Sequence, residues 1–215
     1  MEKLWCFLLA LFSGKTDMCK KAFAFPTSDN SYVSLTPLSK EPLKAFTVCL
    51  YTYTELFRIR SNLFSYAIKK QNNDILLFWT KDIGYSFLVG GSEIPFVVSE
   101  VTAPTLTYMS WESSSDIAEL WDGSSRVRKG LKKGYSPGTE ASIVLGQVQD
   151  SFGGGFEGSQ SLVGDIGNVD MWDFVLSSSD INTIYSGGTF SSSLLNWRTL
   201  TYACGEVYTR SQLWA

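Results

Sequence analysis

The sequence predicts an all-β fold, an antiparallel β-sandwich or jelly roll, and three observations support that prediction. Hydrophobic residues make up 44% of the 215 residues and charged residues 18%, which is typical of a folded globular chain. Aromatic residues reach 14%, as expected for strands that pack face to face. Short runs of strand-forming residues follow one another with turns between them and no long helix, which favours antiparallel sheets.

The expected strands run along almost the whole chain. Alternating apolar residues at Phe46, Val48 and Leu50 indicate that one side of each strand points inward. The predicted strands are AFAFP (22–26), YVSL (32–35), KAFTVCLYTYTEL (44–56), NLFSYAIKK (62–70), DILLFWT (74–80), YSFLVG (85–90), IPFVVS (94–99), LTYMSWE (106–112), IAELWDG (117–123), ASIVLGQ (141–147) and NVDMWDFVLS (168–177).

One helix is predicted, in SSSDINTIYSGG (177–188). Serine and aspartate are favoured N-cap residues, Ile181, Ile184 and Tyr185 have helical spacing, and Gly187 is a favoured stop. The chain shows no internal repeat and no long linker, so residues 15–215 are expected to form one domain.

Residues 1–14 predict a secretory signal peptide. The apolar run LWCFLLALF (4–12) is too short to span a bilayer, and Ser13 and Gly14 are small enough for a cleavage site near Lys15. A buried N-terminal strand is the alternative. No later segment is apolar enough to be transmembrane, so the expected product is a soluble, secreted protein.

The cysteines are odd in number once the predicted signal is removed. Cys19, Cys49 and Cys204 remain after the loss of Cys6, so at least one thiol is expected to be free or intermolecular. The chain has no CxxC pair, and a zinc site is therefore unsupported.

The absence of histidine limits the chemistry that this chain can perform. It excludes Ser-His-Asp and Cys-His nucleophilic sites and His-ligated zinc or copper, so any metal is expected to be a hard cation such as calcium. The net charge of −3 calls for no nucleic-acid partner. We interpret the basic stretch 126–133 as a solvated surface ribbon.

The segment QVQDSFGGGFEGSQ (147–160) is the clearest candidate for a binding loop. It does not fit a phosphate loop, because the glycines lead to Phe156 and Glu157 instead of Gly-Lys-Ser/Thr. It does not fit an EF-hand, because the third and twelfth positions counted from Asp150 are Phe152 and Ser161. A calcium loop of another kind and a plain glycine-rich hairpin both remain open.

Four stretches resemble the pentraxins, and the resemblance covers essentially the whole chain. They are KAFTVCL (44–50), KDIGYSFLVGGSE (81–93), DSFGGGFEGSQSLVGDIGNVDMWDFVLS (150–177) and GEVYTRSQLW (205–214). The resemblance implies a flattened, lectin-like jelly roll with one helix laid on one face, assembled into a cyclic homopentamer. It also implies a secreted, non-enzymatic protein of innate immunity and the acute phase. One face would bind phosphocholine on membranes or bacterial polysaccharide through calcium, and the other would engage complement and Fc receptors.

The calcium ligands that the resemblance implies are only partly kept. The matching positions are Asn72, Asn73, Gln149, Asp150, Glu157 and Gln160. Asn72 replaces a carboxylate of the family, and Gln149 would act through its backbone carbonyl. Val148 stands where the family has the carboxylate that bridges both calcium ions. Because calcium affinity depends on ligand number and charge, we expect weaker binding here, above all at the second ion.

The other implied sites follow the same family pattern. The phosphocholine pocket would use Phe78 against the choline methyl groups and Glu93 toward the quaternary nitrogen, with Leu88 in place of a threonine. Asp122 and Tyr185 match residues of the face that binds complement. For Tyr185, packing between the helix and a sheet explains the residue equally well.

Three departures from the family concern stability. Tyr108 stands where the family has the cysteine that would pair with Cys49, so that bridge cannot form. Cys19 and Cys204 have no family counterpart, and their pairing with each other is one possibility. One residue is missing between Trp121 and Asp122, which would reverse the strand alternation unless a bulge or turn absorbs the loss.

Two other functions compete with the calcium-dependent binding module. A diverged copy that has lost or changed its ligand is the main alternative, because of Val148, Tyr108 and the missing residue. A carbohydrate-active enzyme on a jelly roll is disfavoured, because the chain has no closely spaced pair of acids on a strand.

Overall fold

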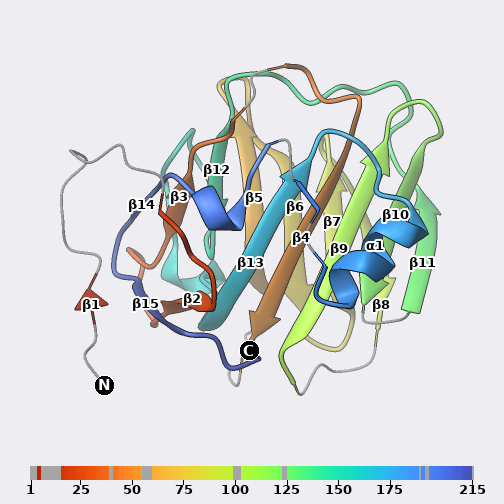
Figure 1. The fold of residues 1–215 in the computed structure, drawn as a ribbon. Helices are drawn as coiled ribbons and strands as arrows, with labels where there is room; N and C mark the ends of the chain where they lie inside the picture. The colour runs from red at the N-terminus through yellow and green to blue at the C-terminus, as the bar shows by residue number, and fades with distance from the viewer. Residues whose placement is uncertain are drawn as a thin grey trace.

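Two antiparallel sheets pack face to face in the computed structural model (Figure 1). The structure describes residues 4–5, 16–38, 41–54, 60–98, 103–122, 125–188, 190–191 and 194–214. Among these, the eight-stranded sheet has the order β1 (Leu4–Trp5), β15 (Tyr208–Ser211), β2 (Lys21–Phe25), β13 (Gly164–Trp172), β4 (Ala45–Tyr53), β9 (Thr105–Glu112), β10 (Ile117–Asp122) and β11 (Ser125–Gly130). The seven-stranded sheet has the order β14 (Tyr202–Cys204), β3 (Val33–Leu35), β12 (Ser142–Leu145), β5 (Arg60–Ile68), β6 (Gln71–Thr80), β7 (Gly84–Val89) and β8 (Ser92–Val97).

The core lies between the two sheets. Phe46, Val48 and Leu50 from β4 are all buried in it, so the alternation seen in the sequence correctly identified the inward side. On β6 the inward residues include Ile75 and Leu77, which leaves the residues between them on the outer side of the sheet. The predicted all-β sandwich is therefore confirmed, and each predicted strand overlaps an observed one.

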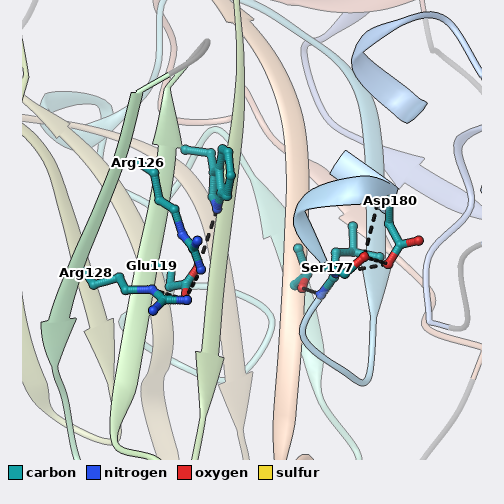
Figure 2. Close-up of polar contacts among 8 residues, drawn as sticks. Glu119, Arg126, Arg128, Ser177 and Asp180 are labelled. Carbon is teal, nitrogen blue, oxygen red and sulfur yellow. Dashed lines mark hydrogen bonds and ion pairs between the residues drawn. The ribbon is translucent and has the colours of Figure 1, made fainter. Parts of the chain in front are cut away.

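Four of the described strands were not among those predicted: β1, in the segment predicted as a signal peptide, and β11, β14 and β15. Strand β11 contains part of the basic stretch and lies at the edge of its sheet, where alternation of apolar residues is weak. Its arginines are held by one acid, since the guanidinium of Arg126 donates to both carboxylate oxygens of Glu119 and Arg128 forms a second ion pair with it (Figure 2). The last predicted strand was placed too late in the chain, because β13 ends at Trp172.

Helix α1 (Ser178–Tyr185) lies across the outer face of the eight-stranded sheet (Figure 1). Ser177, one of the predicted serine and aspartate candidates, is the N-cap, and its hydroxyl and the carboxylate of Asp180 form a capping box (Figure 2). Gly187, with a φ of 80°, follows the helix. Ile181 packs in an outer apolar cluster with Trp172, and this contact fixes the helix on the sheet. Two short 3₁₀ helices are also present, η1 (Gly158–Gln160) and η2 (Trp197–Thr199).

The missing residue near Asp122 does not disturb the described part of β10. Strand β10 stays in continuous antiparallel register with both β9 and β11 from Ile117 to Asp122. The pairing ends with Asp122 opposite Ser125, so the pairing that surrounds Trp121 and Asp122 is intact. No bulge absorbs the missing residue between Ile117 and Asp122, and the turn that follows, residues 123–124, lies outside the described residues.

The N-terminal residues Leu4 and Trp5 pair with Thr209 and Tyr208 of β15. Most of the predicted signal peptide, residues 1–3 and 6–14, lies outside the described residues. Strand β15 is therefore paired with β1 on one edge and with β2 on the other.

The cysteines differ in part from expectation. Cys49 is buried and free, and Tyr108 lies directly opposite it on β9, at the position where the family's bridge would form. Burial raises the pKa of the Cys49 thiol well above its ordinary value. The possible pairing of Cys19 with Cys204 is wrong, because Cys19 is free while Cys204 is disulfide-bonded.

Candidate functional site

A small apolar cluster lies on the outer side of the seven-stranded sheet. It consists of Leu76, Phe78 and Val148, with Leu88 packed against it. Leu76 and Phe78 are two residues apart on β6 and share a face, and Leu88 pairs with Leu76 from β7. Phe78 thus belongs to a cluster separate from the core of the sandwich, which is where a ligand-binding aromatic residue would lie.

A cation already lies over the ring of Phe78. The guanidinium carbon of Arg60 is 3.8 Å from the ring centroid. The Nη2 atom of the same guanidinium is 3.0 Å from the Oε2 atom of Glu93 on β8. Glu93 pairs with Leu88 across β7 and β8, so the carboxylate stands beside the apolar cluster. The structure therefore brings together all three predicted pocket residues, and it adds Arg60 to them.

Oxygen atoms that could ligate a cation lie close together at the beginning of β6. The side-chain amide of Asn72 donates to the backbone carbonyl of Asp150 at 2.7 Å. The side chain of Asn73 is within 3.2 Å of the carbonyl oxygens of both Asn72 and Gln149. With its nitrogen inward this amide donates to both carbonyls, and with its oxygen inward three oxygens converge. Side-chain amide oxygens and backbone carbonyl oxygens are ligands that calcium accepts, so the chemistry of these residues suits a calcium ion.

The side chain of Gln149 holds the glycine segment in place. Its amide nitrogen donates to Ser65 and Ser142, and its amide oxygen accepts from the backbone of Gly153 at 2.9 Å. The side chain is fully buried, which leaves the backbone carbonyl as the oxygen that Gln149 presents to Asn73. This agrees with the role that the resemblance implied for Gln149.

The glycines make a tight turn after this point. Ser151 and Gly154 exchange two backbone hydrogen bonds, at 3.1 and 3.0 Å. Gly155 has a φ of 71°, and an added Cβ would lie only 2.9 Å from the backbone nitrogen of Ser151. The segment therefore forms a hairpin, and this hairpin lies next to the candidate calcium ligands Gln149 and Asp150.

Val148 contributes no oxygen to this region through its side chain. The residue is 5% exposed, and its side chain packs with Phe78 and Leu76 in the outer apolar cluster. The position of the missing family carboxylate is thus filled by hydrocarbon. Val148 precedes Gln149 in the chain and packs in the same cluster as Phe78, so the candidate calcium ligands and the aromatic site are neighbours.

The remaining two predicted ligands, Glu157 and Gln160, contact each other. Glu157 precedes η1, and its carboxylate accepts from the side-chain amide of Gln160 at 3.3 Å. The side chain of Glu157 is exposed. Within the described part of the chain, no group of three or more Asp, Glu, His or Cys residues could hold a metal ion. A calcium site here would therefore depend on amide and backbone oxygens in addition to Asp150 and Glu157.

Residues 21–211 match the model of the Pentaxin family, also written pentraxin. The chain belongs to this family. It is 66% identical to the C-reactive protein of Homo sapiens and 64% identical to that of Oryctolagus cuniculus, and both alignments cover all of each chain. Its fold is similar to that of the heptameric SAP-like pentraxin from Limulus polyphemus, with a TM-score of 0.70 at 19% identity. That alignment covers 88% of this chain and 97% of the Limulus chain. No helix among the described residues of this pentraxin is long and apolar enough to cross a membrane.

The two predicted effector residues of this pentraxin lie on its helix-bearing sheet. Asp122 ends β10, and Tyr185 ends α1 with 43% of its surface exposed. Burial raises the pKa of Tyr185, and the nearby charges of Tyr51 and Asp122 raise it further. The ring of Tyr185 also lies 6.3 Å from that of Tyr108, between centroids. Tyr185 therefore packs on the sheet, as the packing interpretation expects, and it is partly exposed; its role toward complement stays a prediction.

A cavity of about 650 Å³ opens beside this helix. Tyr51, Trp172, Tyr185 and Trp214 line it, and the rings of Tyr51 and Trp214 stack with centroids 5.0 Å apart. Phe78, Leu88 and Asn73 belong instead to the seven-stranded sheet, and Val148, Gln149 and Asp150 follow its strand β12. The candidate binding residues and the candidate effector residues of this pentraxin thus lie on different sheets.

Arg60 was missed by the sequence analysis. Arg60 precedes Phe78 by eighteen positions in the chain. Its partner Glu93 lies on β8, two strands beyond the strand of Phe78. Its sequence signal is weak, since either of the two arginines in FRIRS (57–61) resembles any surface charge.

Proposed function

We propose that this pentraxin is a secreted binding protein, without enzymatic activity, that recognises phosphocholine-bearing surfaces. The observation that supports this most is the placement of Phe78 and Glu93 together on the outer side of the seven-stranded sheet. An aromatic face beside a carboxylate suits a quaternary ammonium group, which is apolar on its surface and positively charged.

Calcium would be held beside this aromatic site. Asn73, the carbonyl of Gln149 and the carboxylate of Asp150 are the residues we assign to the first position. Calcium bound there would supply positive charge to a phosphate oxygen of the ligand. Glu157 and Gln160 would serve a second position, which lacks the oxygens of a carboxylate at Val148. We therefore propose that the second position is the weaker one.

Multivalent display would compensate for modest affinity at each protomer. We propose a homopentamer with five equivalent binding faces on one side, so that several weak contacts act together on a membrane or bacterial polysaccharide. Asp122 and Tyr185 on the other sheet would then face complement and Fc receptors. Residues 1–14 would direct export, leaving residues 15–215 as the pentraxin domain.

A pentraxin with a changed ligand is the second candidate function. The observation in its favour is that Val148 and Leu88, both departures from the family pattern, enlarge the apolar cluster around Phe78. Such a surface would prefer a more hydrophobic head group or an acyl chain.

The test is retention of the expressed protein on immobilised phosphocholine in the presence of calcium. We expect retention, elution by a chelator, and marked loss of retention in the variant Phe78→Ala. Phe174→Ala is the control for the loss of a phenyl ring away from the site, because Phe174 is 40% exposed and follows β13 of the eight-stranded sheet. Secretion without retention would contradict the phosphocholine assignment and favour the changed ligand.

A further inference from the structure

Arg60 occupies the place where an organic cation would bind. Its side chain starts on β5, opposite Thr80 of β6, and reaches across the ring of Phe78 to a carboxylate on β8. Strands β6 and β7 lie between β5 and β8 in the sheet, so the side chain spans the site from one side to the other. The guanidinium contacts both groups that a quaternary ammonium ligand would need, the ring of Phe78 and the carboxylate of Glu93.

The two cations would compete for the same groups. Phe78 is only 3% exposed, and its ring is packed in the cluster with Leu76 and Val148. The guanidinium of Arg60 lies over the ring, and the carboxylate of Glu93 is already engaged by that guanidinium. A ligand cation can reach these groups only when Arg60 moves away.

The contact of Arg60 is weak enough to open. The side chains of Arg60 and Glu93 are 41% and 37% exposed, and ion pairs at that exposure are screened by water. The Nε atom of Arg60 is buried and has no hydrogen-bond partner, which leaves the closed arrangement incompletely satisfied. The side chain is thus held by one ring face and one solvated ion pair.

We propose that Arg60 is a tethered occupant of the cation site, and that it lowers the affinity for quaternary ammonium ligands by competing with them. The proposal rests on the proposed function in one respect, that this site takes an organic cation. It makes Arg60 a determinant of specificity, because only a cation that interacts with Phe78 and Glu93 better than a guanidinium does can displace it.

Choline chloride titrated into the full chain without calcium is the direct probe, followed by the proton signal of the choline methyl groups. Arg60→Ala should tighten choline binding by about tenfold, since removing the competitor removes one cation–π contact and one exposed ion pair. Arg60→Gln keeps most of the side-chain length without the charge and should behave similarly. Lys69→Ala is the control, because it breaks another exposed ion pair, with Glu140, and should change nothing.

A second pair of variants separates competition from a structural role. The carboxylate of Glu93 can pair with either Arg60 or choline. Glu93→Gln should therefore lower the choline affinity by a several-fold larger factor in the Arg60→Ala background than in the unmodified chain. If Arg60 only supports the site, Arg60→Ala weakens binding and the two changes add. Weaker or unchanged choline binding in Arg60→Ala overturns the proposal, and so does an absence of choline binding in every variant.

Parallel measurement on immobilised phosphocholine with calcium keeps the two proposals distinguishable. Tighter choline binding by Arg60→Ala without retention of either protein supports the tethered occupant and contradicts the phosphocholine assignment. Equal retention and equal choline binding by both proteins support the phosphocholine assignment and contradict the tethered occupant.

Discussion

Cys49 and Tyr108 lie directly opposite each other on the neighbouring strands β4 and β9. Both residues are buried, and both belong to the outer cluster beneath α1. The sheet therefore keeps the arrangement for a cross-strand bridge while a tyrosine fills the space. The chain does without the stabilisation of a disulfide at this point.

Tyr108→Cys should restore that bridge. Comparison of the oxidised and reduced forms of this one variant isolates the crosslink from the loss of the tyrosine ring. The oxidised form should have a free energy of unfolding about 4 kcal/mol higher, because the bridge closes a long loop in the unfolded chain. Chemical denaturation measures the difference, and Cys49→Ser with Tyr108→Cys is the control that cannot form the bridge. Equal stability of the two forms would refute the prediction.

Val148→Glu should strengthen calcium binding and weaken the calcium-free protein. A carboxylate here adds a charged ligand next to Gln149, so we expect calcium affinity to rise by about tenfold or more in calorimetry. Without calcium the same charge enters an apolar cluster, and the unfolding midpoint should fall until calcium restores it. Val148→Gln has similar size without the charge and should show much less of either effect. Unchanged affinity in Val148→Glu would show that this position does not face the ion.

Arg210→Met should destabilise the protein in a pH-dependent way. Asp165 is fully buried and is paired with Arg210 across β13, β2 and β15. Burial raises the pKa of Asp165, and Arg210 opposes that shift. Removing the arginine leaves a buried carboxylate without that charge, at a cost of about 3 kcal/mol near neutral pH, the low end for broken buried pairs since Arg210 is 40% exposed.

The pH dependence follows from the raised pKa of Asp165. A carboxyl group with a raised pKa in the folded state stabilises the fold at low pH, and this contribution is lost as the pH rises through that pKa. The pKa rises further in Arg210→Met, so its stability deficit should be smaller near about pH 5 than near about pH 8. Denaturation at the two pH values measures this, and an equal deficit at both would contradict it.

Ser177→Ala should loosen α1 and leave the sheets intact. The hydroxyl of Ser177 accepts from the backbone of Asp180, and losing such a cap costs about 1 kcal/mol. Amide hydrogen exchange should speed up in α1, which carries Tyr185, while β4 and β9 exchange as before. Ser179→Ala is a nearby control without the capping contact to backbone, and uniform acceleration across the protein would argue against a local effect.

Much of the candidate site could be predicted from the sequence, because its residues follow a family pattern in short segments. Asn73, Gln149 and Phe78 were identified by position in their motifs, and the structure places them on or beside β6. Arg60 could not be predicted, because its role depends on the order of β5 to β8 in the sheet. The position of the Val148 side chain was also unknown, since a missing carboxylate does not say what its replacement touches.

The sequence by itself determined the all-β class, the inward faces of the strands, the helix with its cap, and membership of the pentraxin pattern. These properties depend on local periodicity and on residues close together in the chain. Only the tertiary structure decided that Arg60 covers Phe78, that β10 keeps its register to Asp122, and that Cys49 faces Tyr108. Each of these is a contact between different strands, and its geometry is set by how the strands pair and the sheets pack.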